Sequence, residues 1–323
     1  MSSTLLTQIR GLLTVDVDSM DPDVAARHSM PQKFCDMTSN QAIVHGQAAL
    51  PARRDLLKAA VEYVGKKTPQ ESGTFEQEVV DVLTVLLAKE VYPHLTGNVH
   101  AQTSPSAAYD TEKTIKHASK LVALFADHGI SQDRVCIKIP ATPESLLACR
   151  ELQAGGIQTL ATCLFSLPQA VAASQAGCTY VAPYFNELRV HFEPGVWVEK
   201  FESKTLVMPA SIVTPKEVIA LVSLSPDHLT LSGSILDALA TLPALAPESF
   251  TSPDPPPDLR FDGQYLGDYL AYEGALLRET LAEPEVQRKL ADALAIFGQK
   301  EQETRQLVKA FVAGNVHLEE MEI

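Results

Sequence analysis

The sequence predicts an α/β fold: a single (β/α)8 (TIM) barrel over residues 1–323, with extra helices at its C-terminal end. Three observations favour it. Eight short apolar, β-prone runs occur before about residue 240, stretches of helical periodicity separate them, and more helical sequence follows a proline-rich segment. A chain of 323 residues is an ordinary length for one such barrel, so we expect one domain rather than two.

The predicted strands come in regular order, and a helix candidate follows each of them. Helix starts support this phasing, because Thr142-Pro143 and Thr214-Pro215 place an N-cap residue before a proline at the first helical position. The eight predicted strands lie at 12–17, 34–37, 95–102, 135–140, 159–165, 180–185, 205–211 and 228–233.

The region after the eighth strand differs in composition. Residues 249–263, SFTSPDPPPDLRFDG, contain too many prolines and small polar residues for a helix or a central strand, so we expect a loop. Two helices are predicted after it, at 266–282 and 284–313, and we expect them to cover the outside or the mouth of the barrel.

Composition narrows the class of partner. A net charge of −14 argues against general affinity for nucleic acid or anionic membranes, so small molecules are the expected partners. No apolar window is long enough for a membrane span, and the first twenty residues lack the pattern of a secretory signal, so we expect a cytoplasmic protein. Five cysteines without CxxC spacing predict reduced, buried thiols rather than disulfides or a zinc site.

Lys138 is the most informative residue, because it is a lone cation inside the apolar strand VCIKIP. A lysine that points into a barrel is desolvated, which disfavours its charged form, and the neutral amine can attack a carbonyl carbon. The alternative is a lysine near the strand end whose ammonium reaches solvent. The residues alone leave both interpretations open.

Polar side chains follow several other predicted strands. In a (β/α)8 barrel the active site lies at the C-terminal ends of the strands, so these side chains can converge there. Each of them has an ordinary alternative as an N-cap, a turn residue or a core residue. They are Asp18, Asn40, Gln102, Thr103, Thr162, Tyr184 and Ser211.

Four segments, which together run from the second to the sixth predicted strand, resemble signatures of the transaldolase family of class I aldolases. They are CDMTSNQAIV (35–44), VCIKIPATPESL (135–146), GGIQTLATCLFS (155–166) and AGCTYVAPY (176–184). The resemblance implies that Lys138 forms the Schiff base. Gln41 stands where the family usually has proline, and Ser145 stands where glycine is usual.

Other departures concern the acid/base groups. Gln102 stands where ordinary transaldolases carry a glutamate, and Tyr184 stands where phenylalanine is usual. Together with Leu160 and Ala182, these residues are similar to the fructose-6-phosphate aldolase branch, in which a tyrosine and a glutamine hold the catalytic water. The resemblance therefore implies that a phenol replaces a carboxylate in proton transfer, and we expect a nearby ammonium or iminium to lower the pKa of the phenol.

The expected phosphate site is altered as well. The arginine that usually follows the sixth strand is Glu187, and the one after the seventh strand is Val213. A carboxylate in place of an arginine repels a phosphate, so we expect non-phosphorylated or unusual substrates. Arg189, two residues further on, is an alternative phosphate ligand.

The resemblance implies a mechanism without a metal or an organic cofactor. Lys138 attacks the ketone of a hydroxyketone donor, Asp18 and Asn40 position hydroxyl groups, and Thr162, Tyr184 and Gln102 hold a water molecule. Substrate contacts are also expected from Thr38, Leu160, Ala182, Arg189 and Ser211.

The implied partners are ketose and aldehyde substrates, and the resemblance suggests a homodimer. Two alternatives remain open. One is a true pentose-phosphate transaldolase acting on sedoheptulose 7-phosphate and glyceraldehyde 3-phosphate. The other is a non-catalytic, metabolite-binding barrel, because a fold alone does not prove activity.

Overall fold

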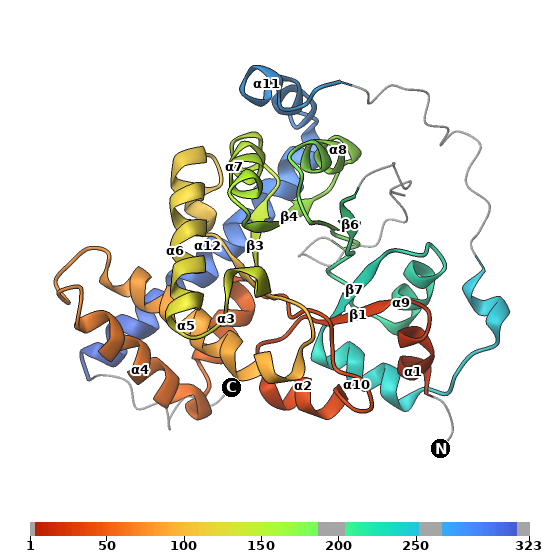
Figure 1. The fold of residues 1–323 in the computed structure, drawn as a ribbon, viewed down its shortest axis with the longest axis horizontal. Coiled ribbons are helices and arrows are strands. Elements are labelled where there is room, and N and C mark those ends of the chain that lie inside the picture. Colours follow the sequence, from red (N-terminus) through yellow and green to blue (C-terminus); the bar gives the residue numbers. More distant parts are fainter. Residues whose placement is uncertain (1–3, 187–203, 252–266, 315–323) are drawn as a thin grey trace.

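The computed structural model describes residues 4–186, 204–251 and 267–314 (Figure 1). Its strands are short, and every pair in the ladders is parallel. They are β1 (Thr14–Val17), β2 (Val99–Gln102), β3 (Val135–Pro140), β4 (Gln158–Leu164), β5 (Tyr180–Pro183), β6 (Leu206–Val207) and β7 (His228–Leu231).

The strands follow one another around a ring in chain order. β2, β3, β4, β5 and β6 form one continuous sheet, and β7 pairs with β1. Met37 forms bridges to both Val17 of β1 and Val99 of β2, so residues 34–37 supply the second strand position. Between β6 and β7, the amide of Val207 donates to the Asp227 carboxylate at 2.9 Å. Eight parallel positions in this order, with the last beside the first, are the arrangement of a (β/α)8 barrel.

Six of the eight predicted strands are shorter in the structure than the sequence suggested, and the second and seventh are shortened most. The segment 34–37 makes only single bridges, at Phe34 and Met37. The segment 205–211 is a strand only at 206–207, because Pro209 has no N–H to donate to a ladder and Ser211 adopts a left-handed φ of 60°. These two predictions were too long, although their positions in the ring are correct.

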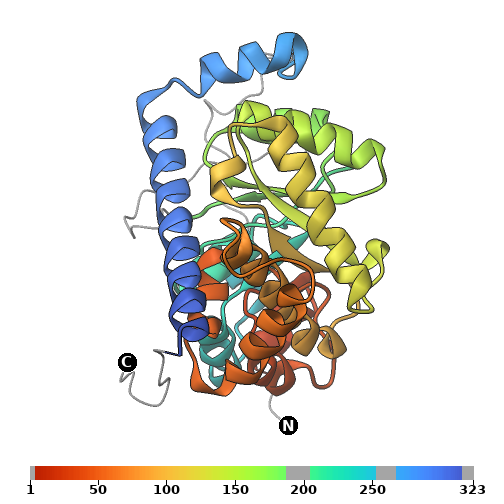
Figure 2. The same ribbon diagram turned by 90° about the vertical axis from the view of Figure 1, so that its left-hand side faces the viewer.

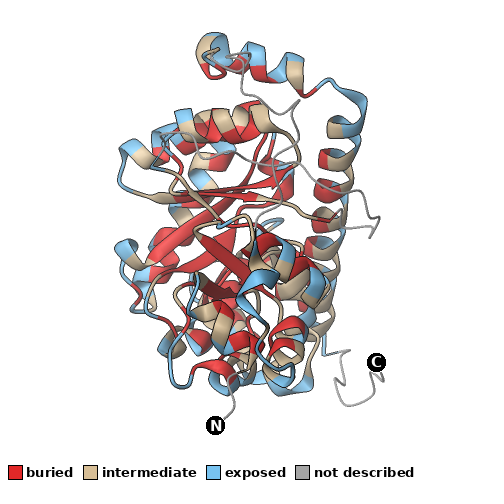
Figure 3. Ribbon diagram, turned by 90° about the vertical axis from the view of Figure 1, so that its right-hand side faces the viewer, coloured by how far each residue is buried: buried red, intermediate tan, exposed pale blue. Residues whose placement is uncertain are grey.

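Helices surround the strands (Figure 3), and the predicted N-caps are confirmed. The Thr142 side chain accepts a hydrogen bond from the Ser145 amide, and Thr214 forms a capping box with Glu217. The helices before the proline-rich segment are α1 (Leu5–Arg10), α2 (Pro22–His28), α3 (Gln41–Ala48), α4 (Arg54–Gly65), α5 (Phe75–Val91), α6 (Thr111–Asp127), α7 (Pro143–Ala154), α8 (Leu167–Gln175), α9 (Pro215–Val222) and α10 (Gly233–Thr241). None of the helices in the described ranges is both long and apolar enough to cross a membrane.

The two C-terminal helices are present where the sequence predicts them, as α11 (Ala271–Thr280) and α12 (Pro284–Val312). Of the predicted loop at 249–263, its first two residues end a short 3-10 helix (Pro247–Phe250), and 252–266 lies outside the described residues. The long helix α12 runs along the barrel and packs against α3 and α5 (Figure 2), so it covers the outside, as expected.

Candidate active site

Lys138 lies near the middle of β3, and its side chain is 2% exposed. In the sheet register its neighbours are Gln102 on β2 and Leu160 on β4. In-register neighbours of a parallel sheet point to the same face, so these three side chains share the barrel interior. Among the described residues, no hydrogen bond or ion pair reaches the Lys138 ammonium. Lys138 is therefore a buried amine without a carboxylate partner in this part of the chain.

Gln102 is held from outside its own strand. Its Nε2 donates to Oε1 of Gln41 at 2.7 Å, and Nε2 of Gln41 donates to the carbonyl of Thr103 at 2.9 Å. Oε1 of Gln102 is buried and has no hydrogen-bond partner among the described residues. An amide oxygen is thus available as an acceptor one strand away from Lys138.

Thr162 and Tyr184 meet on the other side of β3. The Thr162 hydroxyl donates to the Tyr184 hydroxyl at 3.2 Å. Burial raises the pKa of Tyr184 well above its ordinary value, and the charge of Asp18 acts in the same direction. The expectation of a lowered pKa is therefore wrong for the protein without substrate, and the phenol carries its proton at neutral pH. Leu160 and Ala182 are fully buried beside it, in an apolar wall that includes Met208.

Asp18 and Thr38 also come together. The Thr38 hydroxyl lies 2.6 Å from Oδ1 of Asp18 and 2.5 Å from the Thr230 hydroxyl of β7. These contacts hold the carboxylate at the end of β1, on the same edge of the barrel as Tyr184. Of the predicted strand-end side chains, the structure brings Asp18, Thr162 and Tyr184 to this edge, and Thr38, predicted as a substrate contact, joins them.

The side-chain oxygen of Asn40 and the carbonyl of Ser211 already accept hydrogen bonds within the protein. The Asn40 side-chain oxygen caps α3 by accepting from the amides of Ala42 and Ile43, at 2.9 and 3.0 Å, so its amide nitrogen is the group left for a substrate. Ser211 has a left-handed backbone, which is strained for a residue with a side chain. Its carbonyl accepts from the side chain of Asn186 at 2.8 Å.

Cys163 was not among the predicted site residues. Strand alternation places it on the opposite face from Thr162, but β4 is irregular between Ala161 and Leu164, and Cys163 has a φ of 53°. Burial raises the pKa of its thiol to about 12, and it is close enough to Lys138 and Tyr184 for both to act on it electrostatically. A bulge inside an apolar strand leaves no clear signal in a single sequence, so this neighbour could not be found there.

The region where the sequence predicts an altered phosphate site is described in part. Val213 is 41% exposed, and its amide donates to Oε2 of Glu217 at 2.8 Å. The same oxygen accepts from the side chain of Asn186 at 2.9 Å. The Glu217 carboxylate therefore already accepts hydrogen bonds from the donors at this position, the Val213 amide and the Asn186 side chain. Glu187 and Arg189 lie outside the described residues.

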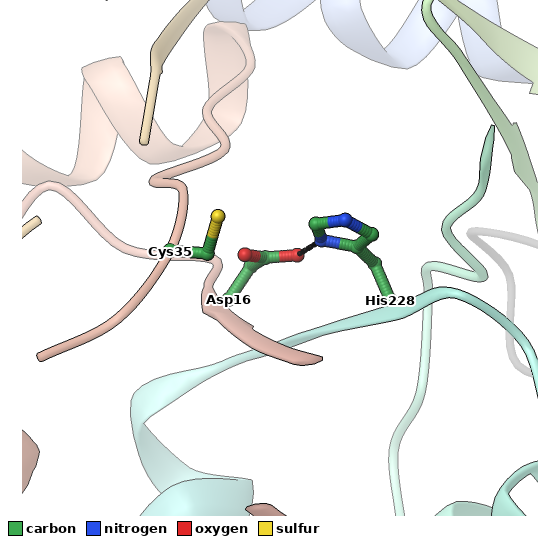
Figure 4. A group of neighbouring side chains, drawn as sticks. All are labelled: Asp16, Cys35 and His228. Carbon is green, nitrogen blue, oxygen red and sulfur yellow. Dashed lines mark hydrogen bonds and ion pairs between the residues drawn. The ribbon is translucent and has the colours of Figure 1, made fainter. Parts of the chain in front are cut away.

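A second polar cluster fills the barrel interior at the N-terminal ends of the strands, away from Tyr184. Asp36 pairs with His100 at 2.8 Å, and Asp16 pairs with His228 at 2.7 Å. Burial alone would raise the pKa of Asp36, but the hydrogen bond and charge of His100 hold it below its usual range. Figure 4 shows Cys35 beside Asp16 and His228, and one potential metal-ligand atom from each lies within 4.8 Å of the others. Because Asp16 is already hydrogen-bonded to His228 and to the Asp36 amide, we assign these groups to the core.

One carboxylate of α12 reaches the loop after β2. Glu301 accepts a hydrogen bond from the Ser104 hydroxyl at 2.9 Å, and burial raises the pKa of this carboxyl. A small cavity of about 20 Å³ lies among α3, α5, α6 and α12, and Asn40 and Gln102 also border it. The C-terminal helix therefore contributes to the outer support of the candidate site.

Comparison with known proteins agrees with this geometry. Residues 14–257 match the model of the family described as transaldolase/fructose-6-phosphate aldolase. The chain is 31% identical over 263 residues to a transaldolase of Acidobacterium capsulatum, covering 74% of this chain and 77% of that protein. It is 32% identical to a transaldolase of Saccharomyces cerevisiae (63% of this chain, 66% of that protein) and 31% identical to one of Cricetulus griseus (72% and 74%). The chain belongs to the transaldolase/fructose-6-phosphate aldolase family of (β/α)8-barrel enzymes.

Proposed function

We propose that this enzyme makes or breaks a carbon–carbon bond between a hydroxyketone donor and an aldehyde through a Schiff base on Lys138. The observation that supports this most is the buried amine itself, which has no carboxylate partner among the described residues and lies between Gln102 and the Thr162–Tyr184 pair. An amine that no carboxylate holds in an ion pair is available to add to a carbonyl carbon.

The reaction begins when the neutral amine of Lys138 adds to the donor ketone and forms a carbinolamine. Loss of water, assisted by a proton donated to the leaving hydroxyl, gives an iminium ion. Its positive nitrogen accepts the electron pair of the breaking carbon–carbon bond. The group that donated the first proton takes up the proton of the hydroxyl on the departing carbon, so that an aldehyde is released and an enamine remains. The enamine then adds to an acceptor aldehyde, or takes up a proton, and hydrolysis frees the lysine.

Tyr184 is the proposed proton donor and acceptor in these steps. Its phenol is protonated before substrate arrives, because burial raises its pKa, so it can donate to the leaving hydroxyl. Thr162 and Gln102 place polar groups on two sides of the water molecule. Asp18, Thr38, Asn40 and Ser211 are the proposed contacts for donor hydroxyls, and Leu160 and Ala182 are the proposed apolar wall.

The proposed substrates are non-phosphorylated ketols and aldehydes. At the end where a phosphate ester would lie, Val213 offers no positive charge, and Glu217 accepts hydrogen bonds from the Val213 amide and from Asn186. In the sequence, Glu187 stands where the family usually has an arginine, and the chain as a whole carries −14. Repulsion weakens phosphate binding, and salt reduces this effect without changing its sign.

The covalent step can be tested by borohydride trapping with a panel of hydroxyketones, read by intact mass and peptide mapping. We expect one reduced adduct, located on Lys138, and none in Lys138→Ala. Lys120, which is partly exposed and paired with Asp81, is an internal control that should stay unmodified. Absence of an adduct with every donor tested would contradict the aldolase proposal and favour a non-catalytic barrel.

The substrate class needs a separate test with matched pairs of substrates. Dihydroxyacetone with glyceraldehyde is compared with fructose 6-phosphate and its aldehyde phosphate by steady-state kinetics. We expect the neutral pair to be used at least as well, and Val213→Arg or Glu187→Arg to improve use of the esters. A preference of about tenfold or more for the esters in kcat/KM, roughly 1.4 kcal/mol, would instead support a pentose-phosphate transaldolase in which Arg189 binds phosphate.

A further inference from the structure

Gln41 and Gln102 are 61 residues apart in sequence, and their side chains bond directly to each other. Both are buried, with Gln41 at the start of α3 and Gln102 at the end of β2. They stand at two positions where the family resemblance implies proline and glutamate. The contact suggests that the two departures belong together.

The backbone determines how both amide groups are oriented. The terminal group of Gln41 that faces the strand lies 2.9 Å from the carbonyl of Thr103 and 3.4 Å from the carbonyl of Gln102. Carbonyl oxygens only accept hydrogen bonds, so this group must be the NH2 of Gln41. Its oxygen then faces Gln102, and the Gln102 atom 2.7 Å away must be a donor, Nε2. Oε1 is therefore the free end of the Gln102 amide.

We propose that Gln41 is a positioning residue that fixes the Gln102 amide with its carbonyl oxygen as the hydrogen-bond acceptor of the active site. Gln102 is the register neighbour of Lys138, and its Oε1 is buried with no partner among the described residues. A water molecule or the carbinolamine hydroxyl can donate to this oxygen. The proposal deepens the Schiff-base function and rests on it.

The same geometry excludes an ionised carboxylate at position 102. A glutamate there would bring an acceptor oxygen against Oε1 of Gln41, with no hydrogen between them. Turning the Gln41 amide over would only move the conflict, because its oxygen would then face the Thr103 carbonyl. Gln41 and a charged residue 102 are thus incompatible, whereas Gln41 and Gln102 satisfy each other.

The test uses four proteins: the wild type, Gln41→Met, Gln102→Glu and the double variant. We expect Gln41→Met to lower kcat by about tenfold with a smaller change in KM, because an acceptor that is no longer fixed positions water less well. In Gln102→Glu, activity should fall at low pH as the new carboxylate becomes protonated. The oxygen of Gln41 faces this carboxylate and disfavours its charge, so the fall should lie about one pH unit higher with Gln41 present than in the double variant.

Gln8 provides a matched control. Its amide also makes two hydrogen bonds to backbone, both with Leu245 at 2.8 Å, but it lies in α1 on the outside of the barrel. Gln8→Met should therefore affect thermal stability and leave kcat and the pH profile unchanged. A similar fall in kcat for both variants would indicate a general effect on folding and overturn the positioning role.

The possible outcomes distinguish failure of the positioning role of Gln41 from failure of the aldolase function. Wild-type kcat in Gln41→Met, or the same acidic limb with and without Gln41, overturns the positioning role while the borohydride adduct on Lys138 still supports the aldolase. If the wild type forms no adduct, the aldolase fails, and urea unfolding of the same four proteins decides the amide contact. At neutral pH, Gln102→Glu should then cost more stability when Gln41 is present than when Gln41→Met has removed its amide, and equal costs overturn the contact.

Discussion

The two ends of the barrel interior differ in whether their buried polar groups have partners. At the N-terminal ends of the strands, Asp36 and Asp16 are each paired with a histidine. Toward the C-terminal ends, the Lys138 ammonium has no ion pair within the described ranges, and Oε1 of Gln102 lacks a hydrogen-bond partner there. A core tolerates charges that are paired, whereas unpaired polar groups cost stability until a ligand satisfies them. The comparison suggests that one end maintains the fold and the other is prepared for substrate.

The largest expected effect comes from Lys138→Met, which removes the proposed nucleophile and keeps a side chain of similar length. We expect turnover and borohydride labelling to be abolished. The free energy of unfolding should stay equal or rise, because a buried polar group without a hydrogen-bond partner among the described residues is removed. Urea denaturation and activity are measured on the same sample, and marked destabilisation of this variant would show that the lysine is structural.

Asp36→Ala tests the other end of the barrel interior, where the buried carboxylates are paired. His100 then loses its partner, and the Asn98 amide loses its acceptor, so we expect unfolding to become easier by about 3–5 kcal/mol. Glu62→Ala, which breaks an exposed pair with Lys58, is the control and should change stability by less than about 0.5 kcal/mol. Equal effects in chemical denaturation would remove the distinction between the two ends.

A smaller effect is expected for Tyr184→Phe, which removes only the hydroxyl group. Turnover should fall by about 10²-fold, the usual scale of a lost proton donor, with the structure unchanged. Gln102→Ala should cost less, since an amide orients water without transferring its proton. Tyr63→Phe is the control, because that hydroxyl bonds to Asp127 at the surface. Normal steady-state rates in Tyr184→Phe would assign the tyrosine to core packing.

The smallest effect concerns the pair of Asp81 and His117 between α5 and α6. Burial opposes both charges, but each partner offsets it, so the pKa of Asp81 is lowered and that of His117 is raised. Asp81 contributes to the free energy of unfolding above about pH 4, and this contribution is lost as pH falls through its lowered pKa. The contribution of His117 is present below about pH 6.5 and is lost as pH rises through its raised pKa.

The pair should therefore stabilise the protein most between about pH 4 and 6.5. Urea unfolding of the wild type and Asp81→Asn across this range gives the measurement. The stability difference should shrink on both sides of the window. A difference that does not depend on pH would mean that the contact contributes by packing alone.

Local patterns in the sequence predict much of this fold. The apolar runs give the position of every strand, and the threonine–proline pairs give the starts of α7 and α9. The lone lysine in an apolar strand identifies the interior amine. These features depend on neighbouring residues, which is why one sequence is enough to find them.

Features that depend on tertiary contact could not be predicted. The bond between Gln41 and Gln102 joins the start of α3 to the end of β2, and the turn of Cys163 into the site depends on an irregular ladder. The hydrogen bond from the Val213 amide to Glu217 could not be predicted either, because a helix-capping residue and a ligand-binding residue look the same in sequence. The raised pKa of Tyr184 needs its surroundings, which only the packed barrel supplies.

The support that α12 gives to the loop after β2 has a consequence for synthesis on the ribosome. Ser104 and Glu301, which bond to each other, are 197 residues apart in the chain. At 5–20 residues per second, the loop is made about 10–40 s before its support. The strand that carries Lys138 is also complete long before α12 emerges. A nascent chain can therefore contain Lys138 while the neighbouring loop is still free to move. If Lys138 is the proposed nucleophile, its labelling by small carbonyl compounds should fall when the last long helix docks.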